Sequence, residues 1–93
     1  MTLASDEPDA GRLQQAREAF ARREWDLARG AFMSIADESP LAASDLEKLA
    51  TALYMLGRHE MYMTALEQSH VAYRDAGQSG PAIRCAFWLG LQH

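Results

Sequence analysis

The amino-acid sequence predicts an all-α protein of about five helices, arranged as stacked antiparallel hairpins. Apolar residues recur at helical intervals along most of the chain, and no segment alternates as a half-buried strand would. Gly and Pro divide these periodic stretches into single-helix lengths. The segment 52–57 (ALYMLG) also resembles the segment 85–90 (CAFWLG), 33 residues later. A repeat of 33–34 residues in a helical chain indicates an array of helical hairpins.

Length, composition and charge narrow the function classes. With 93 residues, 48% hydrophobic and 24% charged, the chain fits one small globular domain. The net charge of −4 opposes direct nucleic-acid binding, which needs a broad basic surface. No apolar run approaches the roughly 20 residues of a membrane helix, and the N-terminus is acidic where a signal peptide is basic. We therefore expect a cytoplasmic domain with no membrane segment.

Residues 1–7 are expected to be flexible, and residues 8–93 to form a single domain. Its first hairpin occupies about 8–39. Pro8 suits the first turn of a helix that runs to about Arg23. A second helix begins near Trp25 and ends at Ser39-Pro40, because a residue before proline avoids the α region. The apolar stripes of the two helices are Leu13, Ala16 and Phe20, and Trp25, Ala28, Phe32 and Ile35.

The second hairpin occupies about 40–77, with helices predicted at 41–56 and 59–76. The segment 44–47 (SDLE) has the form of a capping box, although Ser39 followed by Pro40 is an equally acceptable start for the third helix. Gly57 and Gly77 are expected to end the two helices. The third helix carries the apolar stripe Leu46, Leu49, Ala50 and Leu53.

A fifth helix, at about 80–92, is predicted to lack a partner helix. It follows a Gly/Ser-rich joint at 78–80 (QSG) and begins at Pro81. Apolar residues surround it, whereas repeat arrays usually end in a polar cap. This helix is expected to form a homodimer interface, to dock another protein, or to be paired within a longer chain. The residues expected at a homodimer interface are Ile83, Trp88, Leu89 and Leu91.

The chain resembles a tetratricopeptide repeat. In the first repeat Ala28, Phe32 and Pro40 fall at the small, aromatic and proline positions of that pattern. The third helix of the chain is the first helix of the second repeat. Its apolar stripe fills the packing positions that the tetratricopeptide pattern has in that helix. The tryptophan and glycine expected early in each repeat are absent, and Tyr62 stands where the pattern has alanine. The resemblance implies a right-handed superhelix of two and a half repeats.

A second resemblance covers roughly residues 12–90. The segments 56–59 (LGRH), 72–77 (AYRDAG) and 86–89 (AFWL) resemble helical-repeat segments of large bacterial LuxR-type regulators and their adenylate-cyclase-like relatives. In those proteins the repeats are sensory or protein-contact modules, and a separate module binds DNA. The resemblance implies a regulatory or scaffold module that binds a protein partner. The alternative is a domain that senses a small molecule or peptide.

The first helix of each hairpin lines the inner surface of a tetratricopeptide array. In that register Phe20, Tyr54 and Phe87 occupy equivalent positions. An aromatic ladder in a concave groove would hold a peptide or an apolar ligand, unless the three rings simply pack between helices as core. The residues expected around them are Leu13, Arg17, Glu47, Thr51, Arg84 and Trp88.

Other reactive side chains have simpler explanations. His59 and His70 lie about 16 Å apart along one helix, too far to bind one metal ion. Glu67 with His70 offers only two ligands, so a solvated helix face is the better interpretation. Cys85 has no nearby base and fits a buried small residue. The three methionines of this region, Met55, Met61 and Met63, contact a partner or fill the core. We therefore expect no catalytic, metal or cofactor site, and no enzyme activity.

Overall fold

The computed structural model describes residues 3–92, with side chains described for residues 11–91. The described residues form five helices and no strand, so the predicted all-α class is confirmed. The helices are α1 (Leu3–Ala21), α2 (Trp25–Ala36), α3 (Ala43–Met55), α4 (His59–Asp75) and α5 (Ser79–Gln92).

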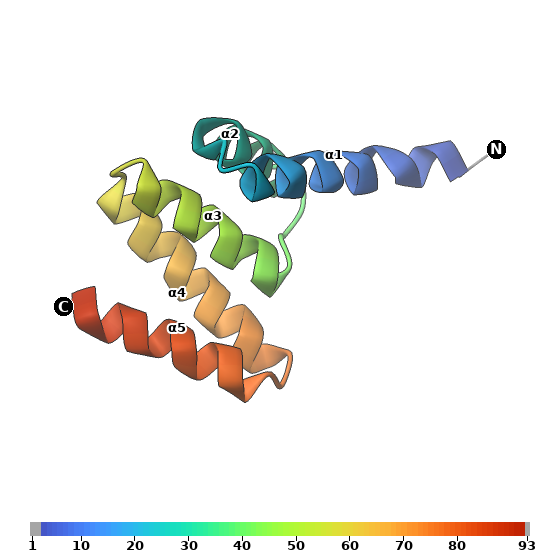
Figure 1. Ribbon diagram of the computed structural model, residues 1–93. Helices are drawn as coiled ribbons and strands as arrows, with labels where there is room; N and C mark the ends of the chain where they lie inside the picture. The colour runs from blue at the N-terminus through green and yellow to red at the C-terminus, as the bar shows by residue number, and fades with distance from the viewer. Residues whose placement is uncertain (1–2, 93) are drawn as a thin grey trace.

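The helices stack in chain order (Figure 1). Each helix packs against the next one, and α1 also contacts α3. Figure 1 shows α3, α4 and α5 running antiparallel to their neighbours, so that α3 and α5 point in the same direction. The resulting domain is elongated, with extents of 49 × 30 × 21 Å. None of the helices within residues 3–92 combines the length and apolarity needed to cross a membrane.

The same turn closes α1, α3 and α4. In each turn, a residue in the left-handed conformation donates its amide to the carbonyl three residues back, and the following amide reaches five residues back. This pair of bonds is the Schellman motif. The left-handed residues are Arg23, Gly57 and Gly77, with φ of 62°, 75° and 77°. Glycine adopts this conformation freely, whereas an arginine there carries backbone strain.

The ends of the first hairpin differ from the prediction. α1 begins at Leu3, upstream of Pro8, and ends at Ala21 rather than at Arg23. α2 ends at Ala36, and a turn at residues 37–38 separates it from Ser39-Pro40. The flexibility expected of residues 1–7 stays a prediction, and residues 1–2 lie outside the described part of the chain.

Neither predicted start of α3 is correct. The helix begins at Ala43, and the residue before it makes no side-chain cap hydrogen bond. Ser44 therefore lies inside the helix, and Ser39 lies in the preceding loop. The acidic residues of the expected capping box, Asp45 and Glu47, bind arginines of α1 and α5 instead of the helix end.

The predicted joint before the fifth helix is largely helical. α5 begins at Ser79, so two of the three joint residues belong to its first turn. The amide of Ala82 donates to the carbonyl of Gln78 at 3.1 Å. Pro81 also lies in this first turn, where its missing amide hydrogen is not needed. The break between α4 and α5 is therefore the short turn around Gly77 rather than the whole segment 78–80.

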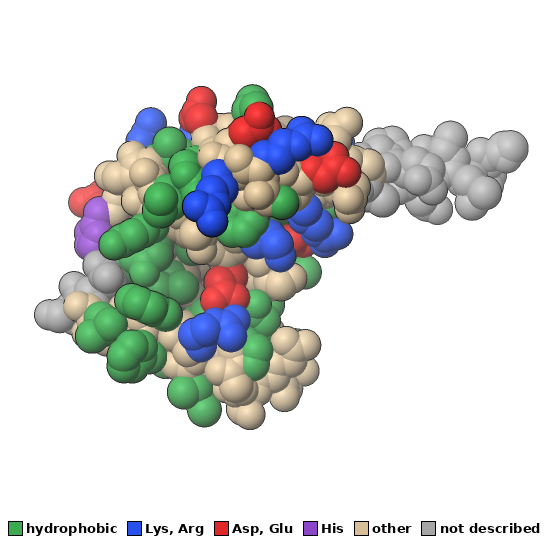
Figure 2. Space-filling model, viewed as in Figure 1, with side chains coloured by type: hydrophobic (Ala, Val, Ile, Leu, Met, Phe, Trp, Pro, Cys, Tyr) green, Lys and Arg blue, Asp and Glu red, His purple; other side chains and the backbone are tan. Residues whose placement is uncertain are grey.

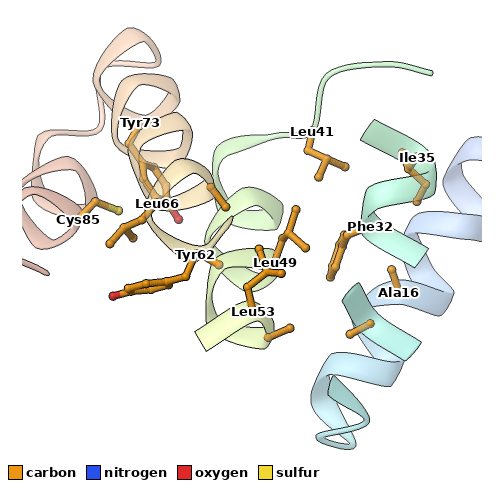
Figure 3. Packing of buried hydrophobic residues seen from close by; sticks show 14 of the residues in the cluster. Ala16, Phe32, Ile35, Leu41, Leu49, Leu53, Tyr62, Leu66, Tyr73 and Cys85 are labelled. Atoms are coloured by element: carbon orange, nitrogen blue, oxygen red, sulfur yellow. The ribbon is translucent and has the colours of Figure 1, made fainter. Parts of the chain in front are cut away.

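A single hydrophobic core runs through the stack (Figure 3). Phe32 of α2 faces Leu49 of α3, and Cys85 of α5 faces Leu66 and Tyr73 of α4. Small residues make up much of the remaining core and let the helices approach closely. The buried alanines are Ala16, Ala19, Ala28, Ala50, Ala52, Ala65 and Ala82.

Candidate functional site

A groove lies along one face of α3, between α1 and α5. Five residues of α3 at helical intervals form its floor: Ser44, Glu47, Lys48, Thr51 and Tyr54. Figure 2 shows this side of the molecule, with hydrophobic side chains gathered where α3 and α5 end, and acidic and basic side chains farther along the hollow. The groove therefore has an apolar end and a polar end.

The apolar end is a hollow of about 290 Å³. Tyr54 and Trp88 stand at its mouth with 58% and 46% of their surfaces exposed. Tyr62 of α4 lies deeper, and its ring centre is 5.2 Å from that of Tyr54. Burial raises the pKa of the Tyr62 hydroxyl, so it stays a neutral group. Ala50, Thr51, Leu66 and Glu47 complete the lining.

The polar end is a second hollow, of about 280 Å³. It shares Glu47 and Thr51 with the apolar end and adds Phe20, Lys48 and Tyr73. Phe20 is half-buried, with its ring edge-on to Trp25 at a centroid distance of 5.5 Å. One lysine and one carboxylate thus face the groove side by side, between two aromatic rings.

Glu47 joins three helices through one carboxylate. Arg84 of α5 donates from Nε to Oε2 at 2.9 Å and from Nη2 to Oε1 at 2.7 Å. The hydroxyl of Tyr73 on α4 donates to Oε1 at 2.8 Å. The hydrogen bonds from Arg84 contribute most to lowering the pKa of Glu47. A carboxylate with three charge-assisted or hydroxyl donors is a weak proton acceptor, so this geometry does not suit a general base.

Tyr73 is the buried member of this cluster. Burial, and then its hydrogen bond to the Glu47 carboxylate, raise the pKa of Tyr73 to about 12. The guanidinium of Arg84 lies 5.9 Å from the centre of the Tyr73 ring, within cation–π range. The cluster therefore has a fixed charge state near neutral pH and holds α5 at a set distance from α3.

A second ion pair ties α1 to α3. Arg17 donates from Nε to Oδ1 of Asp45 at 2.9 Å and from Nη2 to Oδ2 at 2.7 Å. Asp45 is fully buried and lies in the first turn of α3, where the helix dipole favours a negative charge. The hydrogen bond to Asp45 is the main cause that raises the pKa of Arg17. Both walls of the groove are thus anchored to carboxylates of the same helix.

The structure divides the predicted aromatic ladder. Phe20 and Tyr54 line the two ends of the groove, and the predicted surrounding residues Arg17 and Arg84 hold its walls. Phe87 lines neither hollow; it is 61% exposed, and its ring lies 5.8 Å from that of Trp88. Trp88, which was expected beside Phe87, lines the apolar hollow.

The residues expected at a homodimer interface also separate. Ile83 and Leu91 are exposed on α5, whereas Trp88 belongs to the groove. Leu89 is half-buried and packs against the core. Phe87, expected in the groove, instead lies one turn from Ile83 and one turn from Leu91 on the outer side of α5.

The remaining candidates have structural roles. Cys85 is fully buried, as predicted, with its Sγ 3.6 Å from Oγ of Ser69, and burial raises the pKa of its thiol. His59 and Glu67 are exposed. His70 is not on a solvated face: its Nδ1 donates to the carbonyl of Ala82 at 2.9 Å. Within the part of the chain that the structure describes, no acidic, His or Cys cluster suits a metal ion.

The three methionines divide between the surface and the core. Met55 is exposed near the end of α3, whereas Met61 and Met63 pack half-buried against the core.

The sequence matches no family model, and no curated protein and no solved structure is significantly similar to it.

Proposed function

We propose that this protein is a non-catalytic interaction module that binds an apolar segment of a protein partner in the groove along α3. The observation that supports this most is the open hollow between Tyr54, Tyr62 and Trp88. Exposed aromatic side chains around a small hollow are the usual anchors of protein interfaces. The ionised groups beside it are already bound to each other, which leaves them to position helices rather than to transfer protons.

The shape of the groove favours a side chain entering from an extended or helical segment. Its apolar hollow of about 290 Å³ is small beside pockets that enclose whole drug-sized ligands, which reach about 1,000 Å³. The Lys48 side chain places a cation at the polar end of the groove, which adjoins the apolar end. A segment with one large apolar side chain and an adjacent acidic side chain matches both ends.

A small-molecule or peptide effector is the second candidate, because the same hollow lies near the lower end of the ligand-pocket range. An effector present at about 100 times its Kd raises the free energy of unfolding by about 2.7 kcal/mol. A thermal-shift screen of metabolites therefore separates the two candidates: a saturable shift that Trp88→Ala removes favours effector sensing.

We also propose that the five helices form two and a half tetratricopeptide repeats in a right-handed superhelix. The Schellman turns at Arg23 and Gly57 lie 34 residues apart, which equals the repeat length of that family. The contact between α1 and α3 fits successive first helices of such repeats. The role as the regulatory or scaffold part of a cytoplasmic bacterial regulator rests on the sequence resemblance.

A homodimer through α5 is a further part of this proposal. Ile83, Phe87 and Leu91 form an exposed ridge, one turn apart from each other. Arg84 is the only charged residue of α5, and Glu47 binds it on the groove side. Two copies of the ridge can therefore meet without like charges. Sedimentation at about 100 µM should show a dimer, and Phe87→Glu should dissociate it. The control Leu27→Glu, at an exposed position of α2, should leave the dimer intact. A monomeric wild-type protein would contradict the proposed homodimer.

Peptide display tests the groove. A random peptide library selected on the wild-type protein should yield sequences with a large apolar residue. Their affinity should fall about tenfold or more in Trp88→Ala and in Tyr54→Ala, as expected for aromatic anchors. Leu27→Ala is the matched control, since Leu27 is exposed on α2 and lines neither end of the groove. Selected peptides that bind all four proteins equally would contradict the proposal.

A further inference from the structure

A second groove separates α2 from α4. Both helices pack on α3 but not against each other. Two adjoining hollows, of about 390 and 570 Å³, occupy this gap and share Ala36 and Gln68. None of the residues that line them lines the groove between α1 and α5. The two grooves are therefore separate surfaces of the domain.

The floor of this second groove is apolar and adaptable. Leu49 and Leu53 of α3 lie at the bottom and are almost completely buried. Met33 and Met61 form the sides of one hollow and are half-buried. Val71 of α4, which is 41% exposed, lines the other. Methionine side chains adjust to different apolar partners, so this floor suits the apolar face of a helix.

The rim of the second groove is acidic. Its lining residues include four exposed carboxylates and no Lys, Arg or His. Three of them, Asp37, Glu60 and Glu67, form no ion pair with a described residue, and the fourth, Asp75, approaches Arg74 at 4.0 Å. Arg29 of α2 lies beside the floor: its Nη1 is 4.0 Å from the Met33 sulfur, and its Nη2 pairs with Asp26 at 2.8 Å.

We propose that this groove binds a basic amphipathic helix of a protein partner. The apolar face of that helix lies on the floor, and its Lys or Arg side chains meet the carboxylates of the rim. The rim residues of α4 recur at Glu60, Glu67 and Asp75, close to every second turn, so they form a line along the groove. From Glu60 to Asp75 the helix rises about 22 Å, the length of a partner helix of about 15 residues.

Charge complementarity selects this class of partner. Unpaired carboxylates on both sides of an apolar floor repel an acidic helix and attract a basic one. A hydrophobic helix without charges would leave the carboxylates partly desolvated and unpaired, which costs free energy. The acidic overall balance of the chain, −4, adds long-range attraction for the same partner.

The test uses a defined probe: a fluorescent peptide of roughly 18 residues, built from Leu and Lys at helical spacing. Its fluorescence anisotropy should show saturable binding, about tenfold tighter than that of a scrambled peptide of the same composition. A peptide with Glu in place of Lys should not bind. Circular dichroism of each variant first establishes that it folds as the wild type does.

Two matched pairs of variants locate the site. The double variant Glu60→Lys/Glu67→Lys should weaken binding of the Leu/Lys peptide about tenfold or more. The control is the double variant Glu18→Lys/Glu24→Lys, which changes the net charge of the protein by the same amount. It should change the affinity less than about twofold. Val71→Asp should weaken binding about fivefold, and Leu27→Asp should not. Equal binding of the scrambled peptide, or equal losses within either pair, would overturn the proposal. Neither result bears on the groove between α1 and α5.

Discussion

Arg84 of α5 binds the carboxylate of Glu47 of α3 through two hydrogen bonds, of 2.9 and 2.7 Å, although the two residues lie 37 positions apart. Trp88 follows Arg84 by four positions, so it lies one turn farther along the same side of α5. Glu47 and Trp88 both line the apolar hollow. The ion pair therefore sets the position of the tryptophan at the mouth of the proposed binding site.

The first prediction concerns the strength of this ion pair. We expect Glu47→Gln, Arg84→Met and the double variant to give a coupling free energy of about 1 kcal/mol, since Arg84 is half-exposed and solvent screens the pair. Urea unfolding of the four proteins measures it. A coupling indistinguishable from zero would mean that the pair does not fix α5 to α3.

The second prediction contrasts a buried with an exposed carboxylate. Asp45→Ala should destabilise the domain by about 2–3 kcal/mol, because Asp45 is fully buried and binds Arg17 through both oxygens. Glu38→Ala is the control; Glu38 pairs with Arg12 at 2.9 Å on an exposed surface and should leave stability unchanged within error. Equal losses in chemical denaturation would show that burial of Asp45 does not matter.

The third prediction uses backbone strain in the first turn. Arg23 adopts φ of 62° where α3 and α4 place glycine. Arg23→Gly should therefore raise the free energy of unfolding by about 0.5–1 kcal/mol, and Gly57→Arg should lower it by a similar amount. Thermal and urea unfolding check both variants. A destabilised Arg23→Gly protein would indicate that the arginine side chain makes a contact worth more than the strain.

The fourth prediction is a pH dependence from Tyr73. Its folded-state pKa of about 12 lies above the usual value of 10, so folding favours the neutral hydroxyl. The resulting stability is complete below pH 10 and is lost as the pH rises through about 12. Ultraviolet titration of tyrosinate should show a transition near pH 12 that Tyr73→Phe removes. Its persistence in that variant would assign it to another tyrosine.

Helical spacing in the sequence predicted the class, the number of helices and much of the core contributed by α1, α2 and α3, because these depend on local periodicity. The capping box at 44–47 failed for a physical reason: Glu47 and Asp45 have arginine partners on other helices, and the sequence does not show such distant pairs. The left-handed turn at Arg23 was equally hidden, since arginine is not a signal for that conformation.

The groove was predicted only in part. Adjacent residues of a helix point about 100° apart. The repeat alignment paired Phe87 with Tyr54 and put Trp88 beside it, but of these two residues only Trp88 lines the groove. Tyr62 and Tyr73 were missed because they come from α4, whereas the inner surface was expected to use first helices alone. The groove between α2 and α4 exists because these two helices both pack on α3 but not against each other. The local pattern of apolar residues in the sequence does not show how two such helices are spaced.

The groove along α3 is the binding surface that we propose for a protein partner. Its most direct test is a nuclear magnetic resonance titration of the isotope-labelled protein with a display-selected peptide, followed through the backbone amides. We expect the largest shifts at residues 44–54 of α3 and 84–91 of α5, and we expect Trp88→Ala to abolish them at the same peptide concentration. Shifts confined to α2 and the outer side of α4, or unchanged in Trp88→Ala, would contradict it.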